Sequence, residues 1–253
     1  MAEKIQSIAR AFSILESFRD YPDGASVTQL SKDTDLHKST VHRILGTLLD
    51  LGYIEKDKDN KYLISYKLYD LGNIKLKNTN FIEISHGYMK ELSEEVNEVV
   101  HLVIKDDIYT VYVDKVEANN SITMASHVGT RNHLIYTSVG KAMLAPLSDD
   151  EIKDIWDRTP KVKKTEKTIL NFDDFMQNIQ EVRNTNIARD AEENEDGIYC
   201  IGTALYDSTG NVAGAISITG PTFRMTDKLG TELYEKLLKT SYNISRDLGY
   251  VQK

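Results

Sequence analysis

The segment that follows Ser26 constrains the fold of this chain more than any other stretch of the sequence. A short helical pattern over residues 27–34 begins after this capping residue, and a tight connection over 35–37 leads to a longer amphipathic pattern. The longer pattern begins at Lys38 and ends at Gly52, and its apolar residues recur at helical spacing: Val41, Ile44, Leu45, Leu48 and Leu49. A short helix, a tight turn and a long helix in this order predict a helix-turn-helix.

A further helix precedes this pair, and a hairpin follows it. Turn-forming residues 21–24 end a helical pattern that is made by Ile5, Ile8, Phe12, Leu15 and Phe18. After the helix-turn-helix, two short apolar runs flank the polar residues 57–60, which predicts a hairpin with a flexible tip. Three helices and a hairpin predict a winged helix-turn-helix, and the apolar residues between 66 and 77 suit a connecting helix.

Charge is divided unevenly along the 253 residues. The content of 40% hydrophobic residues excludes disorder as the main state, and the net charge of −8 gives no indication of a nucleic-acid partner. However, 12 of the 31 basic and 11 of the 39 acidic residues precede Asn78, which leaves +1 before that residue and −9 after it. A positive surface for nucleic acid must therefore be local.

The local positive charge lies at the start of the longer predicted helix. No acidic residue occurs from Leu36 to Leu49, and the first turns carry polar and basic side chains. A helix N-terminus suits phosphate, short polar side chains contact phosphates or nearby bases, and arginine contacts guanine through two hydrogen bonds. We therefore expect double-stranded operator DNA as a partner, contacted by Lys38, Ser39, Thr40, His42 and Arg43.

The hairpin tip offers a weaker second contact with DNA. Lys58, with Lys56 and Lys61, is placed to follow the neighbouring backbone, although Asp57 and Asp59 reduce the positive charge there. The alternative is that the three helices form only a packing unit with a solvated charged face. The acid-free helix, the order of the helices and the adjacent hairpin favour DNA binding.

From Phe81 onward the sequence predicts an α/β unit. Helices are expected over 81–96, 138–145, 148–158 and 171–183 and from Thr226 to about Leu248. Strands are expected over 99–104, 109–113, 122–127, 198–206 and 212–219. The last two strands form a hairpin that turns at residues 207–211.

Small side chains occupy one face of this final hairpin. Alternation places Cys200, Gly202 and Ala204 on one face of the first strand and Ala213, Ala215, Ser217 and Thr219 on one face of the second, with Val212, Ile216 and Ile218 opposite. These residues leave room either for a ligand or for a closely packed helix. Since a helix is predicted to begin nearby, the N–H groups of Ser138, Val139 and Gly140 are expected to be unpaired and suited to a carboxylate.

Cys200 is the only cysteine, which excludes a disulfide framework and a zinc site made of several cysteines. A single thiol fits a reducing, cytoplasmic compartment. No apolar run approaches the ~18 residues of a membrane helix, and the first residues lack the pattern of a signal peptide. We therefore expect a cytoplasmic protein with no membrane partner. P-loop, GxGxxG and HExxH motifs are absent, which counts against an enzyme, and no cofactor is expected.

Several stretches resemble the IclR family of bacterial transcription regulators. In the first part these are SILESF, SVTQLSKDTDLHKSTVHRILGTLLDLGYIEK and KLYDLG, and in the second part SVGKAMLA and DAEENEDGIYCIGTALYDSTGNVAGAISITGP. The resemblance covers nearly the whole chain. It implies a two-domain α+β fold with a winged helix-turn-helix DNA-binding domain over 1–65, a linker helix over 66–79 and a GAF-like α/β effector-binding domain over 80–253.

The resemblance also implies partners and site residues. Family members bind a small metabolite, often a carboxylate, form homodimers or dimers of dimers, and change their operator affinity when the metabolite binds. The positions that match the family's effector-binding residues are Met124, Ser138, Val139, Asp190, Ile198, Cys200, Ser217 and Thr219. Asn132 and His133 stand where many relatives have an apolar residue followed by proline, which favours a hydroxylated organic acid or a sugar acid as the effector.

Two other functions are compatible with individual residues. Cys200 with His101, His127 or His133 has the groups of a cysteine-dependent enzyme. A metal-responsive regulator would instead use His127, His133, Asp190 and Cys200. We favour a ligand-responsive repressor of a metabolic operon that is not an enzyme and holds no metal.

The acidic run over residues 190–196 suggests calcium but lacks the required pattern. Glu195 stands where the calcium-binding loop of an EF-hand needs glycine. We therefore expect a solvated loop in which only Asp190 is turned inward.

Overall fold

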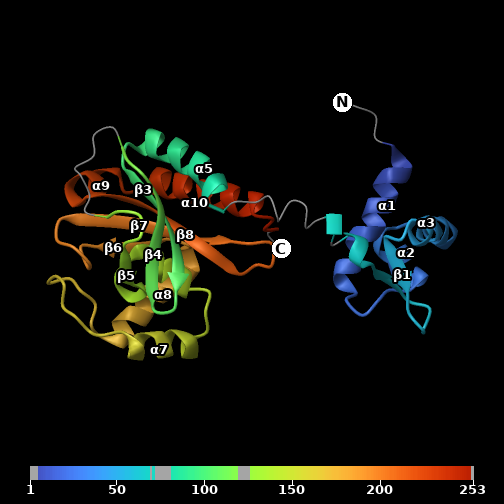
Figure 1. Ribbon diagram of the computed structural model, residues 1–253, viewed down its shortest axis with the longest axis horizontal. Coiled ribbons are helices and arrows are strands. Elements are labelled where there is room, and N and C mark those ends of the chain that lie inside the picture. The colour runs from blue at the N-terminus through green and yellow to red at the C-terminus, as the bar shows by residue number, and fades with distance from the viewer. Residues whose placement is uncertain (1–4, 69, 72–80, 119–125, 252–253) are drawn as a thin grey trace. The chain divides into compact units, whose positions relative to one another are not determined.

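The computed structural model describes residues 5–68, 70–71, 81–118 and 126–251. The chain forms two compact units, Met1–Asn78 and Thr79–Lys253 (Figure 1). Each unit has its own hydrophobic core, so each is described by itself. In the described ranges, no helix is long and apolar enough to cross a membrane.

The N-terminal unit is a winged helix-turn-helix, as the sequence predicts. Its elements are α1 Gln6–Ser17, the 3-10 helix η1 Phe18–Asp20, α2 Val27–Asp33, α3 Lys38–Asp50, β1 Ile54–Lys56 and β2 Tyr62–Ile64. The antiparallel pair β1–β2 forms the wing directly after α3. Residues 66–68 and 70–71 are helical, and the remainder of the expected linker helix lies outside the described residues.

Side-chain hydrogen bonds define the start of α2 and the tip of the wing. Ser26 caps α2, since its Oγ accepts a hydrogen bond from the Gln29 N–H at 3.4 Å and the Gln29 side chain accepts one from the Ser26 N–H at 2.9 Å. In the wing, Asp57 Oδ1 accepts hydrogen bonds from the N–H groups of Asp59 and Lys61, both at 2.8 Å. Asp57 therefore shapes the tip that we expected to be flexible.

Only some of the apolar residues that predicted the first helix are buried in the core of this unit. Ile14 and Phe18 are buried together with residues of α2, α3 and the wing. In contrast, Ile5, Ile8 and Phe12 are 64%, 52% and 58% exposed. The predicted helix is therefore confirmed, but most of the residues that revealed it lie outside the core of this unit.

An antiparallel sheet forms the centre of the C-terminal unit. Its described strands have the order β5-β4-β3-β8-β7-β6. They are β3 Val99–Asp106, β4 Tyr109–Val116, β5 Arg131–His133, β6 Ala188–Ala191, β7 Ile198–Tyr206 and β8 Val212–Pro221. The helices are α5 Phe81–Val96, η2 Leu134–Tyr136, α6 Ser138–Leu144, α7 Asp149–Arg158, α8 Phe172–Thr185, α9 Thr222–Lys228 and α10 Thr231–Asp247.

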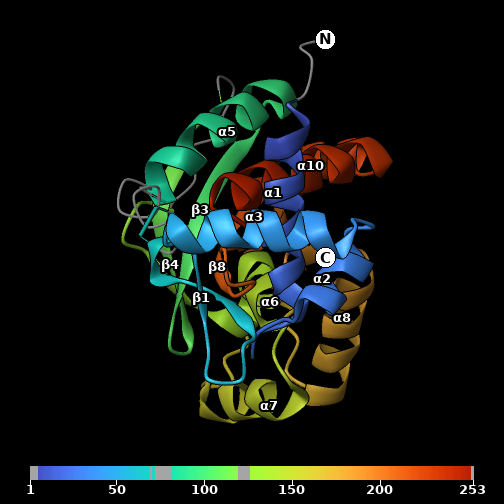
Figure 2. The same ribbon diagram turned by 90° about the vertical axis from the view of Figure 1, so that its right-hand side faces the viewer.

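The helices cover both faces of this sheet. Figure 2 shows α5 and α10 on one side and α7 and α8 on the other. On the first side, Leu102, Ile216 and Ile218 pack with residues of α5 and α10. On the second side, Ala204 and Ala215 pack with α6, α7 and α8. The small residues of β7 and β8 therefore face α6, which is the helix that packs closely against the sheet.

In this unit one prediction was wrong, one lies mostly outside the described residues, and one strand was missed. The strand expected over 122–127 is not found at residues 126–127, while 122–125 lie outside the described residues; the strand β5 begins at Arg131 instead. The closing helix does not start after Thr226, because Thr226 lies inside α9 and the chain breaks at Gly230 before α10. Strand β6 was not predicted at all, since it is short and lies beside an acidic run.

A β-bulge corrects the predicted faces of β8. Leu205 pairs with Gly214 and Tyr206 pairs with Val212, so Ala213 is the extra residue. Val212 therefore packs on the side of Ala215, and Ala213 packs on the opposite side with Ile216. The predicted faces of Ser217, Thr219 and their partners on β7 are unaffected, because these residues lie beyond the bulge.

The close approach of α6 to η2 requires a glycine at position 140. A Cβ atom there would lie 2.0 Å from the Leu134 carbonyl oxygen, which is backbone and has no rotamer to change. Gly140→Ala should therefore lower the free energy of unfolding by about 3 kcal/mol, as in an overpacked core. Chemical denaturation followed by the fluorescence of Trp156, the single tryptophan and a residue of this core, measures the change.

Gly87→Ala is the matched control in the same unit. Gly87 lies within α5, and nothing lies within 4 Å of a Cβ atom at this position. Its replacement by alanine should raise the free energy of unfolding by about 0.5–1 kcal/mol. Equal stability of the two variants would contradict the steric argument for Gly140.

Candidate functional site

The predicted DNA-contacting residues share the exposed face of α3. Lys38, Ser39, His42 and Arg43 are exposed and Thr40 is half-buried, while Val41, Leu45 and Leu48 on the opposite face enter the core. The first turn of α3 contains no acidic residue. In the described part of the chain, no hydrogen bond or ion pair engages the side chain of Lys38, Ser39, His42 or Arg43, so all four are available to a partner.

The wing adds further basic side chains. Lys58 is exposed at its tip. Lys56 instead lies over the Tyr62 ring, with its Nζ 4.7 Å from the ring centroid. This cation–π contact holds Lys56 against the strand pair, so the freer wing cation is Lys58.

A cavity of about 180 Å³ lies between the sheet and the N-terminus of α6. Cross-strand register explains how it forms: Cys200 pairs with both Asp190 and Thr219, which places three predicted residues in one row across β6, β7 and β8. In the next row, Ser217 pairs with Gly202 and His101. Seven of the predicted effector residues line this cavity: Ser138, Val139, Asp190, Ile198, Cys200, Ser217 and Thr219. Met124, the eighth, lies outside the described residues.

The N-terminus of α6 presents backbone donors to this cavity. Gly202 allows the approach, because a Cβ atom on it would lie 3.0 Å from the Val139 nitrogen. The N–H groups of Ser138 and Val139 have no acceptor within the described ranges. The prediction for Gly140 was wrong, since its N–H donates to the capping Thr137 Oγ1 at 3.0 Å.

Asp190 is the buried carboxyl group of the cavity. Its Oδ1 accepts hydrogen bonds from the N–H groups of Glu193 and Asn194 at 2.8 and 3.2 Å. Burial, and then the charge of Glu193, raise its pKa from the ordinary 3.8 to about 7, while Lys141 and the two N–H donors act in the opposite direction. The carboxyl group therefore exchanges its proton near neutral pH.

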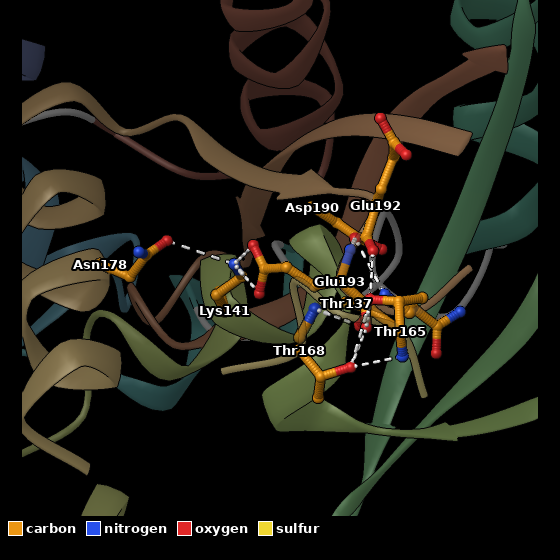
Figure 3. Close-up of polar contacts among 10 residues, drawn as sticks. Thr137, Lys141, Thr165, Thr168, Asn178, Asp190, Glu192 and Glu193 are labelled. Atoms are coloured by element: carbon orange, nitrogen blue, oxygen red, sulfur yellow. Dashed lines mark hydrogen bonds and ion pairs between the residues drawn. The ribbon is translucent and has the colours of Figure 1, made fainter. Parts of the chain in front are cut away.

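A buried ion pair behind the cavity was missed by the sequence analysis. Lys141 is fully buried, and its Nζ lies 2.7 and 2.9 Å from the two carboxylate oxygens of Glu193 and 3.2 Å from Asn178 Oδ1 (Figure 3). The prediction that only Asp190 of the acidic run turns inward was therefore wrong. The sequence SVGKAML does indicate a buried charge, because the other residues of this helix are small or apolar and leave no solvated face for its lysine. A buried lysine in turn requires an acidic partner.

The loop that carries Glu193 is also held from outside. Thr165 Oγ1 donates to the Glu192 carbonyl oxygen at 2.7 Å, and Thr168 Oγ1 donates to the Glu193 carbonyl oxygen at 2.8 Å (Figure 3). Lys167 pairs with Glu192 at 3.0 Å. The wall of the cavity after β6 is therefore fixed by side chains that lie about 25 residues away in the sequence.

Cys200 and His101 lie in one hydrogen-bonded chain. Thr219 Oγ1 lies 3.3 Å from both Cys200 Sγ and His101 Nδ1, and His101 Nε2 lies 2.8 Å from Ser126 Oγ. Burial lowers the pKa of His101 to about 3, and Lys115 contributes. Burial and the charge of Asp190 raise the pKa of the Cys200 thiol. The thiolate and imidazolium of a cysteine-dependent enzyme are therefore both disfavoured here.

The four residues considered for a metal site do not form one. Asp190 and Cys200 line the cavity, but His133 stacks on Tyr109 with 4.6 Å between the ring centroids. Among the residues that the structure describes, no group of three His, Cys, Asp or Glu side chains is placed to hold a metal ion. Asn132 lines the cavity and His133 does not, so only one of the two unusual residues adds polarity to it.

A larger cavity of about 480 Å³ lies elsewhere in this unit, between α6, α8, β7 and α10. The serines that line it already have partners. Ser241 Oγ donates to the Ala204 carbonyl oxygen at 2.7 Å, and Ser245 Oγ accepts from the Tyr206 N–H at 3.0 Å. Both hydroxyls are therefore already bound to backbone groups of β7. The smaller cavity has unpaired donors and is the better candidate site.

Two family models match the chain. The model described as IclR helix-turn-helix domain matches residues 7–58, and the model described as Bacterial transcriptional regulator IclR C-terminal matches residues 74–246. The chain belongs to the IclR family. As an IclR-family protein it is a ligand-responsive, DNA-binding transcription regulator, and this assignment agrees with the winged helix-turn-helix and with the polar cavity.

Individual IclR-family relatives cover almost the whole chain. The HTH-type transcriptional regulator KdgR of Escherichia coli (strain K12) is 32% identical over 249 residues, which are 98% of this chain and 94% of that protein. The HTH-type transcriptional repressor AllR of Klebsiella pneumoniae is 29% identical over 245 residues, with 96% and 90% covered. The crystal structure of the Thermotoga maritima IclR is 31% identical, with a TM-score of 0.65 and with 98% of this chain and 100% of that chain covered.

The raised pKa of Asp190 predicts how stability depends on pH. A carboxyl group that binds its proton more tightly in the folded chain favours folding at low pH, and this contribution is lost as the pH rises from about 4 to about 7. Asp190→Asn keeps the acceptor oxygen but does not titrate. Between pH 5 and 7, the free energy of unfolding should therefore fall more steeply for the wild type than for Asp190→Asn, as measured by urea denaturation at a series of pH values.

Asp227→Asn is the matched control, because Asp227 is an exposed carboxylate on α9 of the same unit. This variant should keep the pH dependence of the wild type. Identical slopes for the wild type and Asp190→Asn would show that Asp190 does not take up its proton in this range.

Proposed function

We propose that the C-terminal cavity binds a small hydroxylated organic acid, such as a sugar acid, and that this effector controls repression by the N-terminal unit. The observation that carries the proposal is a buried cavity with unpaired donors. Ser138 and Ser217 line the cavity, and no hydrogen bond engages their hydroxyls among the described residues, so both hydroxyls are open to the cavity. Hydroxyls without a protein partner can both donate hydrogen bonds to a ligand and accept them from it.

The lining favours an acid with several hydroxyl groups. The effector carboxylate would accept hydrogen bonds from the N–H groups of Ser138 and Val139 at the start of α6. Asp190 and Glu195 line the cavity as acceptors for effector hydroxyls, while Ser217 supplies a further donor. Since no lysine or arginine is found among the described lining residues, a single carboxylate with neutral polar groups fits better than a polyanion.

We propose that the exposed face of α3 contacts operator DNA, with Lys38, Ser39 and Thr40 near phosphates, and with His42 and Arg43 nearer the bases. Lys58 of the wing would contact the neighbouring backbone. The free state of these side chains and the absence of acid in the first turn support this role. The relative AllR is a repressor by name, which supports repression rather than activation.

The regulator would act as a homodimer or a dimer of dimers in the cytoplasm. A pseudo-palindromic operator requires two recognition helices, one for each half-site. Ile8 and Phe12 of α1, with Ile5 directly before this helix, are exposed and offer an apolar surface for such pairing. Effector binding would change the placement of the two winged units through the connecting segment 66–79, and a small change in their spacing suffices to weaken binding to half-sites at fixed positions.

The pKa values of Cys200 and His101 give no support to a catalytic role.

Arg43→Ala tests the DNA-binding face. If Arg43 contacts a base edge, the variant should lose ~1–3 kcal/mol of operator affinity and should no longer prefer the base at that position. Fluorescence anisotropy with an operator duplex, selected from random-sequence DNA by the wild-type chain, and with single-base variants of that duplex measures both effects. A loss that is equal for all sequences would place Arg43 on phosphate only.

Ser217→Ala tests the effector cavity. A thermal-shift screen with small keto acids, hydroxy acids, aromatic acids and sugar acids identifies the compound that stabilises the wild type most. Ser217→Ala and Asp190→Ala should keep the wild-type operator affinity but reduce the response to this compound, because each removes one polar contact. Ser85→Ala is the control, since Ser85 is equally buried on α5, its hydroxyl has no partner, and it lies outside the cavity. An unchanged response in both cavity variants would refute the site.

A further inference from the structure

The C-terminal end of α3 is closed by an unusual set of partners. Gly52 has a left-handed conformation with φ of 75°, and the N–H groups of Gly52 and Tyr53 donate to the carbonyl oxygens of Leu49 and Leu48, both at 2.9 Å. This is a common way to end a helix, and it leaves the next carbonyl groups of the chain pointing outward. The last turn of α3 contains no basic residue of its own.

Two residues from beyond the wing take up these carbonyl groups. Ser65 Oγ donates to the Gly52 carbonyl oxygen at 2.6 Å, and the Ser65 N–H donates to the Tyr53 carbonyl oxygen at 3.1 Å. Lys67 Nζ donates to the Leu51 carbonyl oxygen at 2.9 Å and lies 4.5 Å from the centroid of the Tyr53 ring. We call this set of contacts the α3 clamp. It joins the end of the recognition helix to the first residues of the connecting segment.

The same residues start the helical turn that follows the wing. Ser65 Oγ accepts a hydrogen bond from the Lys67 N–H at 3.2 Å, and residues 66–68 are helical. Ser65 therefore has two roles, since it begins the next helical turn and holds the end of α3. Because Lys67 places its ammonium group at the negative end of α3, the contact is also favoured by the helix dipole.

The position of the clamp separates it from the DNA-contacting face. The residues proposed to contact DNA lie in the first two turns of α3, and the helix has 13 residues. At 1.5 Å per residue, the clamp lies roughly 15–20 Å from the N-terminal turn, which is more than the Debye length of about 8–10 Å in ordinary buffers. The charge of Lys67 is therefore poorly placed to act directly on the phosphates that the helix N-terminus contacts.

We propose that Lys67 is a positioning residue for operator recognition, which sets the orientation of α3 by tying its C-terminal end to the start of the connecting segment. The inference rests on the proposed role of α3 as the recognition helix. Any displacement of the connecting segment at Tyr66 is then transmitted to α3 through the Leu51 and Gly52 carbonyl groups. A positioning residue of this kind affects recognition of the operator and leaves nonspecific attraction to DNA unchanged.

The test compares Lys67→Met with Lys67→Arg in the full chain. Methionine keeps the apolar stem over Tyr53 but removes the donor and the charge, whereas arginine restores both. Lys67→Met should bind the selected operator duplex about 10-fold more weakly than the wild type, because α3 would then hold the orientation that the operator requires only about a tenth of the time. Its affinity for random-sequence DNA and its dependence on salt concentration should match those of the wild type, and its circular dichroism spectrum at the assay temperature should show that it remains folded. Lys67→Arg should bind the operator within twofold of the wild type.

Other results would overturn the inference. Equal weakening for operator and random-sequence DNA, with a salt dependence reduced by about one ion, would make Lys67 a phosphate contact. Operator affinity of Lys67→Met within twofold of the wild type, or no rescue by arginine, would show that the clamp does not position α3. Ser65→Ala provides a second test if Lys67→Met is too unstable to assay, because it removes the hydroxyl that binds the Gly52 carbonyl oxygen. It should weaken binding to the operator and leave binding to random-sequence DNA unchanged.

The two proposals fail in different ways. If Arg43→Ala leaves operator binding unchanged, α3 is not the recognition helix. If Arg43→Ala weakens operator binding but Lys67→Met and Ser65→Ala do not, only the positioning role of Lys67 is refuted.

Discussion

The ion pair between Lys141 and Glu193 is the interaction on which the C-terminal unit depends. Both groups are removed from water, and a buried charge without its partner is strongly destabilising. The pair therefore fixes α6 against the loop after β6. Because Asp190 lies at the end of β6, directly before that loop, and Ser138 begins α6, one interaction behind the cavity sets the distance between its carboxyl group and its backbone donors.

This constraint gives the cavity its chemical character. Lys141 is paired with Glu193 and does not line the cavity, so the described lining presents hydroxyls, free N–H groups and carboxyl groups. Glycine at position 202 brings β7 close enough to α6 for these groups to converge. The lining can therefore discriminate by the pattern of hydrogen bonds, while overall charge attraction contributes little.

The sequence was informative where structure is set locally. Periodicity, the Ser26 cap and the order of the elements predict the winged helix-turn-helix, and α7 lies within the predicted helix over 148–158, with a capping box of Ser148 and Glu151 at its start. Alternation and the family resemblance together indicated seven of the cavity residues. The pair of Lys141 and Glu193 was missed because its partners lie 52 residues apart, and such long-range contacts leave no periodic pattern. The bulge at Ala213 likewise depends on strand pairing, which a single strand does not reveal.

The edge of β7 has a consequence for assembly. Strand β6 covers β7 only from Tyr199 to Gly202, and beyond it Ser241 and Ser245 of α10 bind the Ala204 carbonyl and the Tyr206 N–H. These side chains occupy the groups with which an added strand would have to pair. The end of β7 that β6 leaves uncovered is thereby protected against pairing with an added strand, so a partner that approaches this stretch meets helix α10 rather than free backbone groups.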